Sequence, residues 1–271
     1  GKLYDLLGQT EKAFSHLARG NQLQFDNRGS NIRPEEYMEL VESIARWMSP
    51  EWASSLKPGS DIDGFETPIF LVGFPRSGTT LLDQILDAHP RIQVMEERPA
   101  LDRAVAEIGG YPEAIAGLDD GKLGELREQY FEVVEQYVDR KPGTVLVDKL
   151  PLNIIHLALI VRLFPDAPII LAMRHPCDVV LSNFMQMFQL NNAMGNFYSI
   201  EQAAKLYDRV MGLWLQSAEM LALNFQLSRY EDLVQDVEGA ARSLLEFLNI
   251  DWDDAVLDHT AHARQRGKIN T

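Results

Sequence analysis

The segment from residue 69 to residue 82 has the residue types that hold a phosphate group. An apolar run of strand character ends at Gly73, and a short loop follows that ends at Gly78. Thr79 and Thr80 then begin a predicted helix with leucine and isoleucine at helical spacing. Such a loop directs backbone N–H groups inward, and the helix dipole adds partial positive charge. The segment therefore predicts an anion-binding loop.

The charged residue of this loop is in an unusual place. The spacing from Gly73 to Gly78 is that of a Walker A loop, but Thr79 occupies the position of the Walker lysine, and the positive charge lies earlier, at Arg76. A kinase normally needs that lysine against the transferred phosphate. The pattern favours a protein that binds a phosphate group without transferring it. A P-loop nucleotide kinase or hydrolase is the alternative function.

The loop and the residues after it resemble the sulfotransferase family. Residues 75–80 resemble its 5′-phosphosulfate loop, and residues 86–97 resemble the tyrosylprotein sulfotransferase branch and its bacterial relatives. The similarity extends over about residues 68–236. It implies transfer of a sulfuryl group from 3′-phosphoadenosine-5′-phosphosulfate (PAPS) to a hydroxyl acceptor, with 3′,5′-adenosine bisphosphate (PAP) as the product.

The resemblance also implies the residues that bind the donor. It assigns the 3′-phosphate to Arg174 and Ser182, and the neighbourhood of the adenine and the 3′-phosphate to Tyr230. An arginine at a strand end and a hydroxyl two turns into the next helix can meet at one phosphate. The loop residues assigned to the 5′-phosphate are Arg76, Ser77, Gly78, Thr79 and Thr80.

Three residues match the catalytic positions of the family. Glu97 matches the general base, which takes the acceptor's proton. Lys149 and Arg76 are implied to stabilise the oxygen that leaves sulfur, and Asp148 is expected to orient Lys149. His89 is the rival base, because many other sulfotransferases use histidine, although it is explained more simply as part of a helix stop.

The chain departs from the tyrosylprotein branch at two places. Pro99 stands where that branch has a second arginine, two residues past the base, and Arg98 is its neighbour. Family members also carry cofactor contacts near their C-termini, beyond the point where this chain stops. We expect part of the 3′-phosphate lid to be missing, with residues 262–266 as the nearest candidates for it.

The elements around these residues predict an α/β fold. Helical patterns separate the expected strands, so we expect a P-loop NTPase-like, mainly parallel sheet with helices on both faces. Ligands of such sheets bind beyond the carboxyl ends of the strands, where Gly73, Glu97, Lys149 and Arg174 all lie. The expected strands cover residues 69–72, 92–94, 144–147, 169–173 and 226–230.

The N-terminal part is predicted to be helical. Residues 1–24 resemble the second half of a tetratricopeptide repeat (TPR), with an ordinary helical hairpin as the alternative. We expect a helical segment over residues 1–48, a linker over 49–67, and the sulfotransferase domain over 64–271, truncated at its C-terminus. A third hypothesis is a non-catalytic nucleotide-binding scaffold whose repeat binds partners. We expect the chain to be a fragment of a longer protein.

Composition narrows the remaining possibilities. The 271 residues have 46% hydrophobic content and a net charge of −15, which argues against nucleic acid as a partner. No apolar run approaches a membrane span, and no signal peptide is evident. Cys177 is the only cysteine, which fits a reducing cytoplasm. We expect no metal, and an acceptor that is a protein tyrosine, sugar, lipid or small phenol. A homodimer, and a protein partner bound through the TPR-like region, are the assemblies considered.

Overall fold

The computed structural model describes residues 1–28, 31–57, 59 and 64–259. The chain divides into two compact units. The first combines Gly1–Arg46 with His175–Gln216, and the second combines Trp47–Arg174 with the described residues from Ser217 onward. The division expected at residues 48 and 64 stays a prediction.

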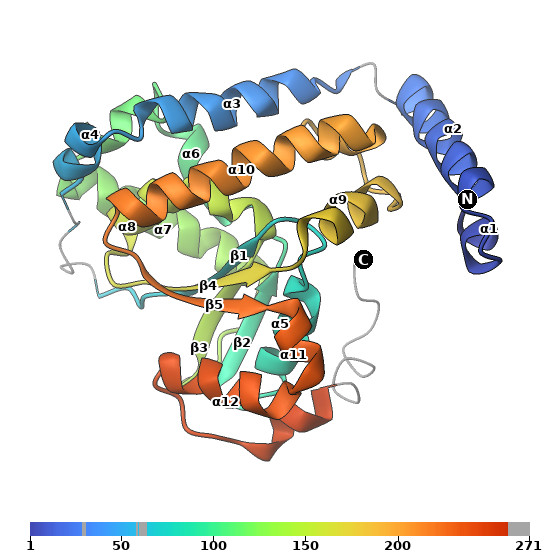
Figure 1. Cartoon of the computed structure of the whole chain (residues 1–271). Coiled ribbons are helices and arrows are strands. Elements are labelled where there is room, and N and C mark those ends of the chain that lie inside the picture. The colour runs from blue at the N-terminus through green and yellow to red at the C-terminus, as the bar shows by residue number, and fades with distance from the viewer. Residues whose placement is uncertain (29–30, 58, 60–63, 260–271) are drawn as a thin grey trace. The chain divides into compact units, whose positions relative to one another are not determined.

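The second unit contains a five-stranded parallel sheet (Figure 1). Its strand order is β2-β3-β1-β4-β5, with β1 in the centre. All five strands lie where the apolar runs predicted them, so the predicted parallel α/β fold is confirmed. The strands are β1 (Ile69–Gly73), β2 (Ile92–Glu96), β3 (Val145–Lys149), β4 (Pro168–Met173) and β5 (Asn224–Arg229).

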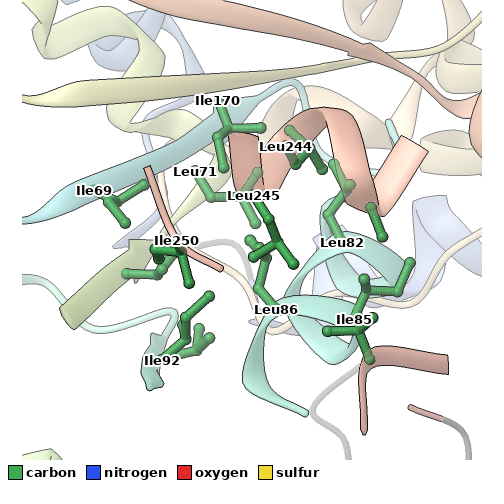
Figure 2. Packing of buried hydrophobic residues seen from close by; sticks show 14 of the residues in the cluster. Ile69, Leu71, Leu82, Ile85, Leu86, Ile92, Ile170, Leu244, Leu245 and Ile250 are labelled. Atoms are coloured by element: carbon green, nitrogen blue, oxygen red, sulfur yellow. The ribbon is translucent and has the colours of Figure 1, made fainter. Parts of the chain in front are cut away.

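One face of the sheet is covered by α5 (Thr79–Asp87) and α12 (Val237–Phe247). Figure 2 shows Leu82 and Leu86 of α5 packed with Leu244 and Leu245 of α12 against Leu71 and its neighbours. These side chains are 0–2% exposed. Burial of this kind stabilises the fold by about 1.5–3 kcal/mol for each large apolar side chain. It also fixes α5, the helix that begins at the predicted loop.

The opposite face is covered by α7 (Asp120–Tyr137) and α8 (Leu157–Leu163). Phe70 of β1 points to this face, where its ring lies 6.2 Å from that of Tyr130 and 5.8 Å from that of Phe164. Alternation along the strand therefore sends Phe70 and Leu71 to opposite faces.

Several short elements differ from the expectation. The predicted linker contains α4 (Pro50–Ser55), whose first turn is capped by Ser49 accepting from the N–H of Trp52. Between β3 and β4, a 3-10 segment η3 (Pro151–His156) is followed by α8. The other elements of this unit are α6 (Ala100–Ala106), η2 (Glu113–Gly117), α11 (Tyr230–Gln235) and η5 (Asp254–Asp258).

The first unit is helical. Asn21 of α2 donates to the carbonyl of Phe184 at 2.9 Å, and the rings of Phe14 and Phe184 stack with centroids 5.2 Å apart. The helix α2 therefore packs on the end of α9, which stops at Phe184. The elements are α1 (Lys2–Leu6), α2 (Thr10–Arg28), α3 (Pro34–Trp47), α9 (Pro176–Phe184), η4 (Met194–Tyr198) and α10 (Ile200–Met220). The resemblance to a TPR stays a prediction. Within the described ranges, no helix has the length and hydropathy needed to cross a bilayer.

Candidate active site

The predicted functional residues of the second unit lie along one edge of the sheet. Because all five strands are parallel, their carboxyl ends meet at this edge, and each strand delivers one part of the candidate site. In spatial order, the parts are Glu97 after β2, Lys149 at the end of β3, the loop 74–78 after β1, Arg174 after β4 and Tyr230 after β5.

The loop after β1 depends on its two glycines. Gly78 has φ of 102°, and a Cβ there would lie 2.7 Å from Cδ2 of Tyr230. A Cβ on Gly73 would lie 2.6 Å from the carbonyl oxygen of Ala172. Side chains at either position would push the loop off its neighbours, so the spacing seen in the sequence has a direct steric reason.

Polar groups line the inside of this loop. The N–H groups of Thr79 and Thr80 are in the first turn of α5, where helix geometry leaves them without intrahelical acceptors. Ser77 is 2% exposed, and its Oγ has no hydrogen-bond partner among the described residues. Its N–H donates to the carbonyl of Phe74 at 3.1 Å, so this amide closes the loop. Arg76 has a left-handed backbone with φ of 70°.

Arg174 and Tyr230 form the next part of the edge. The guanidinium carbon of Arg174 lies 4.6 Å from the centroid of the Tyr230 ring, a cation–π arrangement. The Tyr230 ring also lies against Gly78, where an added Cβ would clash with it. The loop, Arg174 and Tyr230 therefore form one contiguous surface.

Lys149 is the most buried charged residue of the site. Its side chain is 0% exposed, and its Nζ lies 2.8 Å from Oε1 of Glu97, 3.1 Å from Oε1 of Glu96 and 3.8 Å from Oδ2 of Asp83. An unpaired buried ammonium costs on the order of several kcal/mol. Three carboxylates around one cation offset this cost and leave the cluster with excess negative charge.

Asp148 lies on the other face of the sheet from Lys149. Its carboxylate accepts a hydrogen bond from the hydroxyl of Tyr130 at 3.0 Å. Burial raises the pKa of Asp148 to about 7; the hydrogen bond from Tyr130 acts in the opposite direction, and the charge of Asp102 adds to the rise. The expected contact between Asp148 and Lys149 is replaced by one between Asp83 and Lys149, because adjacent residues of a strand point to opposite faces.

The two candidate bases have different surroundings. The Nε2 of His89 lies 3.0 Å from the carbonyl oxygen of Asp251, and its Nδ1 lies 3.1 Å from the backbone nitrogen of Arg91, so both ring nitrogens contact the backbone. The side chain of Glu97 is 42% exposed and contacts Lys149. Glu97 also has φ of 50°, a strained conformation of the kind that gathers at functional sites.

Two predicted parts of the donor site are outside the described residues of the second unit. Ser182 is on α9 in the first unit, and its convergence with Arg174 on one phosphate stays a prediction. Residues 262–266 lie outside the described residues.

Sequence reasoning missed Asp83. Its carboxylate is part of the Lys149 cluster, and the residue is 1% exposed on the apolar side of α5. The available signal was an acid between Leu82 and Ile85, at a helix position that should face the core. A buried acid at such a position needs a cationic or hydrogen-bonding partner.

The fold defines an α/β protein with a P-loop-like parallel sheet, and sequence comparison gives its family. The sequence profile of the sulfotransferase family matches residues 68–254, so the chain belongs to the sulfotransferase family.

Two individual relatives are similar to this chain, and one of them is named a sulfotransferase. Protein-tyrosine sulfotransferase 1 of Danio rerio is 30% identical over 211 residues, which cover 74% of this chain and 58% of the relative. An uncharacterized protein of Aquifex aeolicus (strain VF5) is 28% identical over 261 residues, covering 92% of this chain and 34% of the relative. The chain therefore spans less than two thirds of the length of both.

Solved structures agree on the fold. The sulfotransferase domain of the olefin synthase from Synechococcus PCC 7002 superposes with a TM-score of 0.50 at 23% identity. The superposition covers 75% of this chain and 81% of that domain. This similarity concerns the fold alone.

Proposed function

We propose that this chain transfers a sulfuryl group from PAPS to a hydroxyl oxygen. The observation that supports the proposal most strongly is the order of residues along the carboxyl edge. A carboxylate and a buried lysine lie on one side of the phosphate loop, and an arginine stacked on an aromatic ring lies on the other. This order suits a nucleotide whose reactive end points to Glu97 and whose adenosine end points to Tyr230.

In this proposal, the loop and its neighbours hold the donor. The N–H groups and hydroxyls of Thr79 and Thr80, with the orphaned hydroxyl of Ser77, bind the 5′-phosphate at the start of α5. Arg174 and Ser182 bind the 3′-phosphate, for which a planar guanidinium is well suited. Tyr230 contacts the neighbouring adenosine.

Glu97, Lys149 and Arg76 perform the chemistry. Glu97 accepts the proton of the acceptor hydroxyl as that oxygen forms its bond to sulfur. The bond between sulfur and the bridging oxygen breaks, and its electron pair stays on the phosphate of the departing PAP. Lys149 and Arg76 stabilise this developing charge, so positioning and electrostatics contribute most of the catalysis, as in phosphoryl transfer.

The acceptor class is a hydroxyl, with protein tyrosine as the first candidate. Support for tyrosine comes from relatives named protein-tyrosine sulfotransferase at 28–30% identity. The guanidinium carbon of Arg98 lies 4.3 Å from the ring centroid of Tyr137, so this side chain stacks on α7. Pro99, the residue before α6, stands in place of the arginine of the tyrosylprotein branch. An acidic peptide would therefore find a different arrangement of positive charge beside Glu97 than in the tyrosylprotein branch.

The test is transfer of label from ³⁵S-PAPS to four acceptors: a tyrosine peptide, a sugar, a lipid alcohol and a small phenol. We expect transfer to at least one of them, with the label recovered on the acceptor oxygen and PAP released in equal amount. Glu97→Gln should remove transfer, and Glu96→Gln, at the last residue of β2, is the matched control. No transfer from an enzyme that binds PAP would support the non-catalytic scaffold.

The competing nucleotide chemistry has its own outcome in this assay. Hydrolysis of ATP that depends on Mg²⁺ and is unaffected by PAP would support a kinase or hydrolase. We expect sulfuryl transfer to continue in EDTA, because Lys149 and Arg76 supply the positive charge. A cytoplasmic location, a homodimer and a partner bound to the N-terminal helices stay predictions.

A further inference from the structure

Asp83 is a buried acid with no place in the proposed reaction. It lies on α5, one helical turn after Thr79, and its side chain is 2% exposed. Its Oδ2 is 3.8 Å from Nζ of Lys149, which is itself fully buried. Burying a carboxylate costs free energy unless its charge is paired with a cation or hydrogen-bonded.

The three carboxylates around Lys149 differ in their freedom to move. The side chain of Glu97 is 42% exposed and that of Glu96 is 20% exposed, so both have solvent beside them. The side chain of Asp83 has almost no solvent beside it. Its helix is also fixed in the core by Leu82 and Ile85, which are 1% exposed. Of the three, Asp83 is the carboxylate whose position is set by the fold.

This difference matters when the base acts. Glu97 is the nearest partner of Lys149, with 2.8 Å between Oε1 and Nζ, so this oxygen contacts the ammonium and not an acceptor hydroxyl. If Glu97 turns to the acceptor hydroxyl, Lys149 loses that partner while it remains buried. A buried ammonium needs another carboxylate at that moment.

We propose that Asp83 is a positioning residue that holds the ammonium of Lys149 at the edge of the sheet and thereby frees Glu97 to serve as the base. The inference rests on the proposed function for its catalytic consequence. The contact between Asp83 and Lys149 has a consequence of its own, which can be measured without any transfer.

The test compares Asp83→Asn with Asp87→Asn in the full chain. Asparagine keeps the shape of aspartate and removes its charge. Asp87 lies one turn further along α5, and its carboxylate accepts from the N–H of Val94 at 3.2 Å, so it is the matched control. Asp83→Glu keeps the charge and is the conservative variant. Each variant is measured for turnover, for PAP affinity by calorimetry, and for the ¹H–¹⁵N resonance of the Lys149 ammonium, assigned with Lys149→Met.

We expect Asp83→Asn to lower kcat at least about tenfold and to leave the Kd for PAP within about threefold, with partial rescue in Asp83→Glu. The Lys149 ammonium resonance should be visible in the wild-type protein, and should shift or disappear in Asp83→Asn. Asp87→Asn should change neither kcat nor the resonance.

Three results would overturn the inference. They are a wild-type protein without the ammonium resonance, an unchanged resonance in Asp83→Asn, and equal losses of kcat and PAP affinity in Asp83→Asn and Asp87→Asn. If the wild-type protein transfers no sulfuryl group, the proposed function fails, and the resonance alone decides the role of Asp83.

Discussion

Glu97 and Lys149 are joined twice, through the side chains at 2.8 Å between Oε1 and Nζ, and through the backbone at 2.8 Å between the N–H of Glu97 and the carbonyl oxygen of Lys149. Lys149 ends β3, and Glu97 directly follows β2, the strand that pairs with β3. The double contact places a proton acceptor beside a cation at the carboxyl ends of the parallel strands. In the proposed reaction, these are the groups needed at the attacking oxygen and at the leaving oxygen.

Replacing the proposed base should remove chemistry and spare binding. We expect Glu97→Gln to lower kcat about 100- to 10,000-fold, because a positioned general base contributes about that much. The Kd for PAP should stay within about threefold. Glu96→Gln, which removes a neighbouring carboxylate also within reach of Lys149, should lower kcat far less. Equal losses in the two variants would argue against Glu97 as the base.

Arg174 should matter for the nucleotide and not for the fold. We expect Arg174→Ala to weaken PAP binding about 10- to 100-fold in calorimetry, because it removes charge-assisted hydrogen bonds to a phosphate. Arg242→Ala is the control, since Arg242 also stacks on an aromatic ring, that of Trp252, with 3.8 Å between guanidinium carbon and centroid. Comparable PAP affinity in both variants would contradict the assignment.

Gly78 should tolerate no side chain. Gly78→Ala places a Cβ 2.7 Å from the Tyr230 ring in a backbone with φ of 102°. We expect loss of measurable PAP binding together with a loss of stability. Gly143→Ala has a comparable backbone, with φ of 77°, but no atom within 4 Å of the added Cβ. It should cost about 1 kcal/mol from backbone strain alone and keep PAP binding.

Thermal unfolding and PAP titration of these two glycine variants separate the effect of backbone strain from the effect of a clash with the Tyr230 ring. If Gly78→Ala bound PAP as tightly as Gly143→Ala, the contact between the loop and Tyr230 would have no part in nucleotide binding.

Asp148 should make stability depend on pH. Burial raises its pKa to about 7 in the folded protein from 3.8, so the folded state keeps a proton that the unfolded state loses first. The contribution of Asp148 to stability is therefore full below pH 4 and decreases as the pH rises to 7. The difference corresponds to on the order of 4 kcal/mol at most.

Asp148→Asn keeps the acceptor for Tyr130 and cannot ionise. We expect the difference in unfolding free energy between wild type and variant to shrink or reverse from pH 4.5 to pH 7.5, and then to level off. Denaturant titrations of both proteins at five pH values measure this difference in unfolding free energy. Parallel curves for the two proteins would show that Asp148 is ionised throughout this range.

The sequence was sufficient for the parts of the fold that depend on local pattern. All five strands were predicted from the sequence, and the glycine-bounded loop predicted the start of α5. Glu97, Lys149 and Arg174 were expected at the carboxyl edge because each follows a strand, and the structure places them there.

Other features depend on contacts between distant segments. The strand order that puts β3 between β2 and β1 brings Lys149 between Glu97 and the loop, and no local pattern encodes it. The contact of Asp83 with Lys149 depends on how α5 packs against β3. The helix α4 was missed because Pro50 was taken as a linker residue, whereas it begins the helix after the cap Ser49.

The most direct test of the account is whether one adenosine nucleotide is held at both its 5′ and 3′ ends. Calorimetric titration of the wild-type chain with PAP, 5′-AMP and Mg²⁺-ATP measures this. The account predicts micromolar binding of PAP, at least about tenfold weaker binding of 5′-AMP, which lacks the 3′-phosphate, and no requirement for Mg²⁺. Equal affinity for PAP and 5′-AMP, or preferential binding of Mg²⁺-ATP, would contradict it.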